Sequence, residues 1–289
     1  MPKKVFFGLM LFAFALTSYS GHAQERPYFI TYSHEMEEPG NLEVKLGNVA
    51  GKPPSGSRFL GSALELEYGA TAWWTMEAYL DGQVTQHDRT VFTGYRWENR
   101  FRPLLREHWI NPVIYIEFEN INGADKALLE IVGHDGKENL IDPNGQARTE
   151  KKREIELKLI LGSNHKGWNI SENFIMEKNL AGSPWEFGYA WGVSRPLALV
   201  AKSHDCTFCG EKFQAGVEMY GGLGERYSFG TSETSHYFGP AINWSAPNGL
   251  VLSFSPQFGL NDHSVPHLFR FGVSYEIDQF LSRFHRGNK

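Results

Sequence analysis

The residues able to do chemistry in this chain are mostly carboxylates, and many of them recur at every second position. In the stretch "ALELEYGATAWWTMEAYLDG", residues 63–82, Glu65 and Glu67 alternate with apolar residues, as do Glu77 and Asp81. Successive side chains of a strand point to opposite faces, so the acids lie on one face of a hairpin and the apolar side chains on the other. Two environments fit this pattern: a soluble sheet with its acids in solvent, or a transmembrane barrel with its acids in a wet lumen.

The same period of two continues along most of the chain. We read it in twelve segments: 41–49, 59–69, 72–83, 88–100, 111–120, 152–163, 168–178, 184–194, 211–222, 235–245, 249–258 and 266–277. About ten residues is the length with which a tilted strand crosses a bilayer. We therefore predict an all-β fold, a transmembrane antiparallel up-and-down β-barrel of about 12 strands, with 10 or 14 as the open alternatives.

The connections and the aromatic residues favour the barrel over a soluble β-sandwich. Residues 69–71 and 246–248 predict tight turns, whereas residues 121–151 predict a long polar loop, and outer-membrane barrels have short turns at one end and longer loops at the other. Sandwich strands usually have only about five or six residues. Aromatic residues lie near strand ends on the apolar faces, as in the girdles of membrane barrels: Tyr68, Trp74, Trp97, Trp185 and Trp244. Glu172 does not fit, because it falls on an otherwise apolar face.

The N-terminus predicts export. "MPKKVFFGLMLFAFALTSYSGHAQ" has two lysines, a short apolar run, and then small residues at the −3 and −1 positions before Gln24, which is typical of a secretory signal peptide. We expect a signal peptide at 1–23, a lead-in segment at 24–40, the barrel at 41–278 and a tail at 279–289. A short N-terminal anchor helix is the alternative. The expected location is the outer membrane, with the lipid bilayer and the barrel-assembly machinery as partners.

Composition excludes several classes of protein. The formal net charge of −5 argues against a nucleic-acid partner. No apolar run after the N-terminal one has the length of a membrane-spanning helix. Two cysteines are too few for a fold held together by disulfides.

Cys206 and Cys209 have the spacing CxxC in "HDCTFCGEKF". No His follows the second cysteine, so covalent haem attachment is not indicated. A local disulfide is the expected state outside the cytoplasm. A zinc site that also uses His204 and Asp205, and a pair of free thiols, remain the alternatives, and we expect no metal.

An enzyme active site is not indicated by any motif. Ser, His and acidic residues are neighbours at His134, His236 and His263, but none has a nucleophile and oxyanion donors at a telling spacing. "GGLGER" follows a strand and has no Lys-Ser/Thr pair, so it is not a phosphate-binding loop. We therefore expect neither catalysis nor a cofactor.

The barrel interpretation defines a charged lumen. Its predicted lumen-lining residues are Glu65, Glu67, Glu77, Asp81, Arg96, Glu98, Glu117, Glu119, Glu154, Glu156, Lys158, Arg270 and Glu276, together with Arg100, Glu186 and Glu218. This set has twelve acids and four bases, and carboxylates in a narrow pore favour cations. The alternative is that acids and bases pair across neighbouring strands and fill the lumen without conducting.

Three stretches also resemble a known family. "RPYFITYSHEMEEPGNLEVKLGN", "LELEYGATAWWTMEAYLDG" and "EMYGGLG" are similar to the opening and the hairpins of Gram-negative outer-membrane barrels of the phenol meta-pathway transporter type. The similarity is loose and extends over the chain after the signal peptide; "QFLSRFHRGNK" departs from it by continuing beyond the last strand. The resemblance implies a twelve-stranded barrel and a transport role, and no catalytic residues.

These observations lead to one hypothesis and two alternatives. We expect a porin-like outer-membrane channel or uptake protein that passes small solutes through an acidic lumen. A structural or plugged barrel without transport is the first alternative, and an outer-membrane hydrolase is the second.

Overall fold

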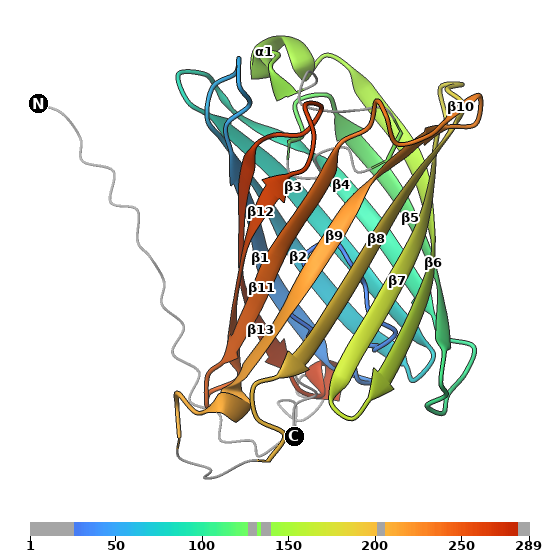
Figure 1. Ribbon diagram of the computed structural model, residues 1–289, viewed down its shortest axis with the longest axis vertical. Coiled ribbons are helices and arrows are strands. Elements are labelled where there is room, and N and C mark those ends of the chain that lie inside the picture. Colours follow the sequence, from blue (N-terminus) through green and yellow to red (C-terminus); the bar gives the residue numbers. More distant parts are fainter. Residues whose placement is uncertain (1–25, 127–131, 134–139, 201–205, 283–289) are drawn as a thin grey trace, which may run out of the picture.

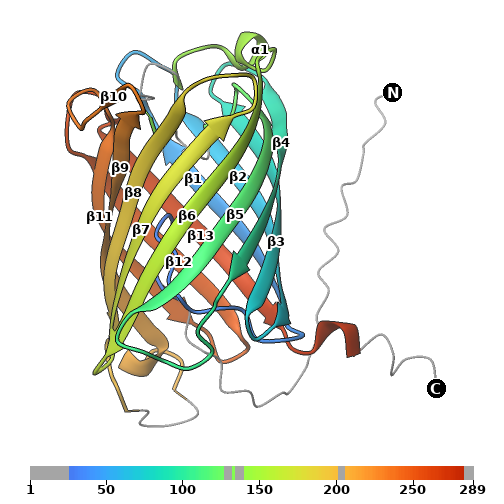
Figure 2. The same ribbon diagram turned by 90° about the vertical axis from the view of Figure 1, so that its right-hand side faces the viewer.

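The chain forms a closed antiparallel β-barrel, as predicted (Figures 1 and 2). The computed structural model describes residues 26–126, 132–133, 140–200 and 206–282, so the expected signal peptide lies outside the described residues. Twelve strands make the wall: β1 (Leu42–Gly51), β2 (Phe59–Thr71), β3 (Trp74–Thr85), β4 (Thr90–Phe101), β5 (Asn111–Asn122), β6 (Lys151–His165), β7 (Trp168–Asn179), β8 (Trp185–Pro196), β9 (Phe213–Glu225), β11 (His236–Ser245), β12 (Leu250–Gly259) and β13 (His267–Ile277). The barrel closes where β1 pairs with β13 over ten residues.

The two ends of the barrel differ. At the near end, where β1 begins and β13 ends, lie the connections 72–73, 102–110, 166–167, 197–212 and 246–249. The connection 197–212 contains the 3-10 helix η2 (Gly210–Lys212). The far end carries the short helix α1 (Asn144–Ala147) and β10 (Ser228–Phe229), a two-residue strand that pairs only with β9 (Figure 1). The described part of the predicted long loop therefore lies at the far end, and the tight turn predicted at 246–248 lies at the near end.

The wall has an apolar outside and a polar inside. On β3, Leu80 is 50% exposed and points outward, whereas its neighbours Tyr79 and Asp81 are buried within the barrel. The same alternation runs along β5, where Ile114 and Ile116 are exposed and Glu117 is buried. An apolar exterior around a polar interior is the arrangement of a transmembrane barrel, the reverse of a soluble sheet. In the part of the chain that the structure describes, no helix is both long and apolar enough to span a membrane.

Glu172 lies on the outside of the wall, as its place in the alternation indicated. It is exposed on β7 between Ile170 and Phe174 and pairs with Trp191 and Leu161 of the adjacent strands. The carboxylate is therefore a real exception to the apolar exterior and not an error in strand register.

The turn predicted at residues 69–71 is wrong. These residues belong to β2, and the turn lies at Ala72 and Trp73. Gly69 is required for close packing instead, because a Cβ atom on it would lie 2.1 Å from the carbonyl oxygen of Glu38. Its backbone N–H donates to Asn41 and its carbonyl accepts from Gly40, which ties the start of β1 to the hairpin.

One seam in the wall is interrupted. β11 and β12 pair at Phe238–Phe258 and again at Ile242–Phe254, but not at the positions between. Pro240 and Pro256 lie in this gap, and proline has no backbone N–H to donate to a ladder. The Ser255 hydroxyl donates to the Pro240 carbonyl at 2.8 Å and replaces part of the missing ladder.

Candidate functional site

The inner face of β1 to β7 carries most of the charged side chains. The structure places every predicted lumen-lining residue on the inner face of the barrel: Glu65, Glu67, Glu77, Asp81, Arg96, Glu98, Arg100, Glu117, Glu119, Glu154, Glu156, Lys158, Glu186, Glu218, Arg270 and Glu276. They are buried or half-buried there, although charged side chains in globular proteins are mostly exposed.

Two arginines organise the first part of this charged wall. Arg96 lies between Asp81, at 3.0 Å from its Nε, and Glu117, at 3.3 Å from its Nη1. Arg100 contacts Glu98 at 2.8 Å and also pairs with Glu67. Arg96 therefore joins acids of the two neighbouring strands, β3 and β5, and Arg100 joins an acid of its own strand to one of β2. This is the ladder of ion pairs expected as the alternative use of these residues.

Two lysines continue the ladder on either side. The Lys158 ammonium lies 2.7 Å from Glu156 and over the ring of Tyr115, 4.2 Å from its centroid. Lys45 lies 2.5 Å from Glu65. Acids and bases thus hold one another in place along the wall. A charged side chain in surroundings of low dielectric constant needs such a partner of opposite charge.

Three carboxylates come close enough to hold a cation. Oxygen atoms of Glu117, Glu119 and Glu156 all lie within 4.8 Å of one another, the one such group found among the described residues. Glu117 is also bound by Arg96, and Glu156 by Lys158. The group fits an oxygen-ligating cation in type, but its existing ion pairs compete for the same oxygens.

The inner face of β8 to β13 is lined largely by small residues. Gly192, Ala190, Gly216, Ala241 and Ser253 point inward here. The resulting space is occupied by the lead-in segment, residues 26–40, which enters from the near end, bends inside the lower half of the barrel and returns to β1 (Figures 1 and 2). The small wall therefore makes room for a part of the chain that the alternation pattern did not place.

Glycines fit the aromatic rings of the segment. A Cβ atom on Gly192 would lie 2.4 Å from the ring of Tyr28, and one on Gly162 would lie 2.1 Å from the ring of His34. The Tyr28 hydroxyl donates to Asn169 Oδ1 at 3.0 Å. Larger residues at these glycines would displace the segment.

The tip of the segment reaches the charged wall. The Tyr32 hydroxyl donates to Glu98 at 2.9 Å and lies 2.9 Å from the Tyr79 hydroxyl. The Tyr32 and Tyr115 rings meet edge to face, with centroids 5.1 Å apart. The segment therefore contacts both the wall of β8 to β13 and the charged wall of β1 to β7, and it narrows the lumen between them.

Two acids of the segment have opposite pKa shifts. Burial raises the pKa of Glu37 to about 9, and the nearby carboxylates of Glu67, Glu276 and Glu43 act in the same direction. Burial would also raise the pKa of Glu35, but the hydrogen bond and charge of Arg26 outweigh it, so this pKa lies below its ordinary value. Glu35 is thus held as an anion at the base of the segment, and Glu37 as a neutral acid.

The far half of the lumen is partly filled by the long loop. Val132 and Leu140 of this loop are buried in an apolar cluster with Tyr220, Tyr237 and Leu268 of the wall. The Gly133 backbone N–H donates to the Phe187 carbonyl at 3.1 Å. Val132 and Leu140 of the loop therefore pack inside the barrel mouth, whereas α1 of the same connection lies at the rim (Figure 1).

A cavity remains between the segment and the charged wall. Its volume is about 300 Å³, and it is lined by both. Thirteen acidic and seven basic side chains contribute to the lining. The lumen thus has an open space with an excess of acidic side chains, bounded by Tyr32 of the segment and Val132 of the loop.

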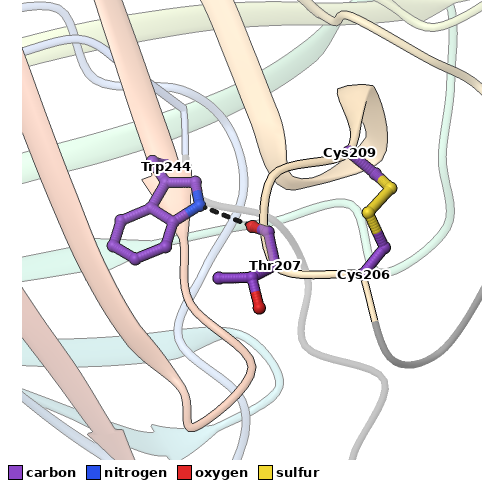
Figure 3. The surroundings of a disulfide bond; sticks show 4 residues. All are labelled: Cys206, Thr207, Cys209 and Trp244. Atoms are coloured by element: carbon purple, nitrogen blue, oxygen red, sulfur yellow. Dashed lines mark hydrogen bonds between the residues drawn. A yellow bond between two sulfur atoms is a disulfide. The ribbon is translucent and has the colours of Figure 1, made fainter.

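Cys206 and Cys209 form a disulfide at the near end (Figure 3). Figure 3 shows Trp244 Nε1 donating to the Thr207 carbonyl between the two cysteines, at 2.9 Å. Phe208 stacks on the same indole with centroids 5.2 Å apart. The disulfide closes a short loop, and Thr207 and Phe208 of this loop contact Trp244 on the outer side of the wall, away from the lumen. His204 and Asp205, the other ligands of the zinc alternative, lie outside the described residues.

Several lumen residues were missed from the sequence. Glu43 and Lys45 on β1, Lys152 on β6 and Glu177 on β7 line the cavity as well. The same alternation would have identified them. The contacts of the lead-in segment gave no such signal, because it has no periodicity.

Comparisons with known proteins identify the fold. No family model and no curated protein matches the sequence. The solved structure of the COG4313 outer membrane channel from Pseudomonas putida F1 matches at a TM-score of 0.55 and 10% identity, over 84% of this chain and 97% of that one. The NanC porin matches at 0.49 and 9%, over 82% and 100%, and the KdgM porin at 0.45 and 8%, over 81% and 98%. At these identities the comparison shows the fold of outer-membrane channel barrels, and the phenol meta-pathway transporter type stays a prediction.

Proposed function

We propose that this protein is an outer-membrane channel for small cationic solutes. The observation that carries the proposal is the cavity of about 300 Å³ with its excess of acidic side chains, inside a closed barrel that has an apolar exterior. Carboxylates between low-dielectric walls raise the local concentration of cations. The structural match to an outer-membrane channel supports the location and the barrel, and the signal-peptide pattern supports export.

The structure corresponds to a narrowed state of this channel. The lead-in segment occupies the near half of the lumen, and part of the long loop occupies the far half. Passage of a solute requires that at least the segment moves. We expect small, intermittent currents and not the steady large conductance of an open porin.

The test is single-channel recording in planar bilayers with a salt gradient. The reversal potential should show a preference for cations, and Glu119→Gln combined with Glu177→Gln should reduce it. Neither residue is in an ion pair of the described part of the chain, so the change removes two ionisable carboxyl groups from the cavity lining and leaves the ion pairs of Arg96, Arg100 and Lys158 intact. The effect should shrink as salt rises, because screening acts over about 10 Å at 0.1 M.

The control is Glu233→Gln, which makes the same substitution at one exposed loop position at the far end. It should leave the reversal potential almost unchanged. A protein that inserts and passes no current under any voltage would contradict the channel.

The plugged structural barrel is the second candidate, and one observation favours it. The apolar cluster of Val132 and Leu140 with the wall is a packed contact and not a loose loop. Absence of current would therefore support this function in place of the channel.

A further inference from the structure

The barrel wall holds the lead-in segment by its backbone as well as by its side chains. Glu218 of β9 accepts hydrogen bonds from three successive backbone N–H groups, those of Phe29 at 3.2 Å, Ile30 at 2.7 Å and Thr31 at 2.5 Å. Gln257 of β12 donates to the same carboxylate at 3.3 Å. A carboxylate that binds three main-chain donors does not depend on which side chains the segment carries.

Two asparagines extend this backbone recognition. Asn173 of β7 accepts from the Tyr32 N–H at 2.7 Å and donates to the Tyr32 carbonyl at 2.9 Å. Its side chain therefore binds both backbone polar groups of one residue. Asn243 of β11 donates to the Arg26 carbonyl at 3.1 Å. Side chains from three strands, β7, β9 and β11, thus satisfy main-chain groups that would otherwise be buried without partners.

We propose that this inner wall is a binding site for an extended oligopeptide with basic side chains, and that the lead-in segment occupies it as an internal competitor. The contacts that hold the segment are available to any peptide backbone of similar shape. The inference deepens the proposed function, on which it rests, by naming the class of solute.

The opposite wall supplies the preference for basic side chains. Carboxylates of β1 to β7 face the segment across the cavity, and acids outnumber bases in the lining. The segment itself brings a cation to its base, where Arg26 pairs with Glu35 and donates to Asn164 at 3.1 Å. A peptide with lysines at alternate positions would place its backbone on the small wall and its ammonium groups toward the acids.

The experiment measures binding directly, without a requirement for conduction. The full-length protein in detergent is titrated with a dye-labelled Lys-Ala-Lys-Ala-Lys amide, and fluorescence anisotropy gives the dissociation constant. Two probes separate backbone from charge. The first is the same peptide with N-methylated backbone, which cannot donate to Glu218. The second is spermine with the dye on one amine, which keeps three positive charges, as the peptide does with its dye on the N-terminus, and has no peptide group. The peptide should bind about tenfold more tightly than either probe, a factor that corresponds to one good hydrogen bond to a charged group.

Variants separate the contribution of the segment to peptide affinity from that of the wall. Tyr28→Ala with Tyr32→Ala removes side-chain anchors of the segment and leaves the wall unchanged. Peptide affinity should then rise about tenfold because the competitor is weakened. In that background Glu218→Gln should lower peptide affinity about tenfold and spermine affinity only slightly.

The matched control for Glu218 is Glu154→Gln, an inward acid that removes the same charge and accepts from the Asn179 side chain, not from the segment. Because Glu154 lines the cavity and acts on both probes through its charge, this change should weaken peptide and spermine binding by equal, small factors. Equal affinity for the peptide, its N-methylated form and spermine on the wild-type barrel would overturn the inference. Because this readout needs only a folded barrel, a protein that binds the peptide and passes no current would contradict the channel and leave the peptide site standing.

Discussion

Replacement of Gly192 by Ala should release the lead-in segment from the lumen. The added Cβ would lie 2.4 Å from Tyr28 Cε1, whereas ordinary contacts begin at 3.4 Å, so the ring must move by about 1 Å. That shift costs about 1–3 kcal/mol of overpacking, and loss of the Tyr28 to Asn169 hydrogen bond adds about 1 kcal/mol. The population of undocked segment should therefore rise by about 30-fold to 700-fold, at tenfold per 1.4 kcal/mol.

Thiol labelling measures this release. Thr31→Cys places a reporter at a buried position of the segment, in a protein whose own cysteines are joined in a disulfide. A maleimide should label the reporter much faster in the Gly192→Ala background. The control is Gly272→Ala on the same half of the wall, where the nearest segment atom, in Phe29, would lie at an ordinary 3.7 Å. Equal labelling rates in the two glycine variants would refute the account of how the wall accommodates the segment.

Three further predictions concern the wall, the segment and the disulfide. Leu80→Arg should destabilise the barrel in lipid vesicles by about 2–4 kcal/mol and Val84→Arg by about 0–1 kcal/mol, since Val84 lies about 13 Å further along the same outward face; equal costs in urea unfolding would contradict the lipid-facing assignment. Burial keeps Glu37 protonated, with a pKa raised to about 9, so its contribution to docking is complete below the ordinary glutamate pKa and is lost as pH rises through about 9. Proteolysis of the segment should accordingly increase from pH 6 to pH 10 in the wild type and not in Glu37→Gln, and the same pH dependence in both proteins would exclude Glu37 as the cause. Cys206→Ser with Cys209→Ser should lower barrel stability by about 2 kcal/mol at most, because the closed loop is very short; a cost well above this in thermal melting would show that the connection supports the whole wall.

The barrel could be predicted because its physical signal is local and repeated. Each wall strand faces two environments, so the period of two along β3 or β5 reports lipid on one side and lumen on the other. This alternation placed Glu65 and Glu117 on the inner face. The same rule also explains Glu172. Its side chain points outward as its place in the strand requires, and only its charge is unusual on that apolar face.

The position of the lead-in segment could not be predicted from this signal. Its contacts join residues far apart in the sequence, such as Ile30 with Glu218, and its backbone groups are satisfied by side chains instead of a ladder. The glycines that admit it are ambiguous in sequence. Gly69 suggested a turn, and only the structure shows that it is required for the close approach of Glu38.

The interrupted seam between β11 and β12 has a consequence for the exchange of backbone amide hydrogens with solvent. Ladder pairs are missing between Phe238 and Ile242, whereas β5 and β6 pair without a break from Asn111 to Asn122. Amide hydrogens near the two prolines are therefore expected to exchange with deuterium earlier than those of the β5–β6 seam. We therefore expect the closed wall to begin its local unfolding by separation of β11 from β12.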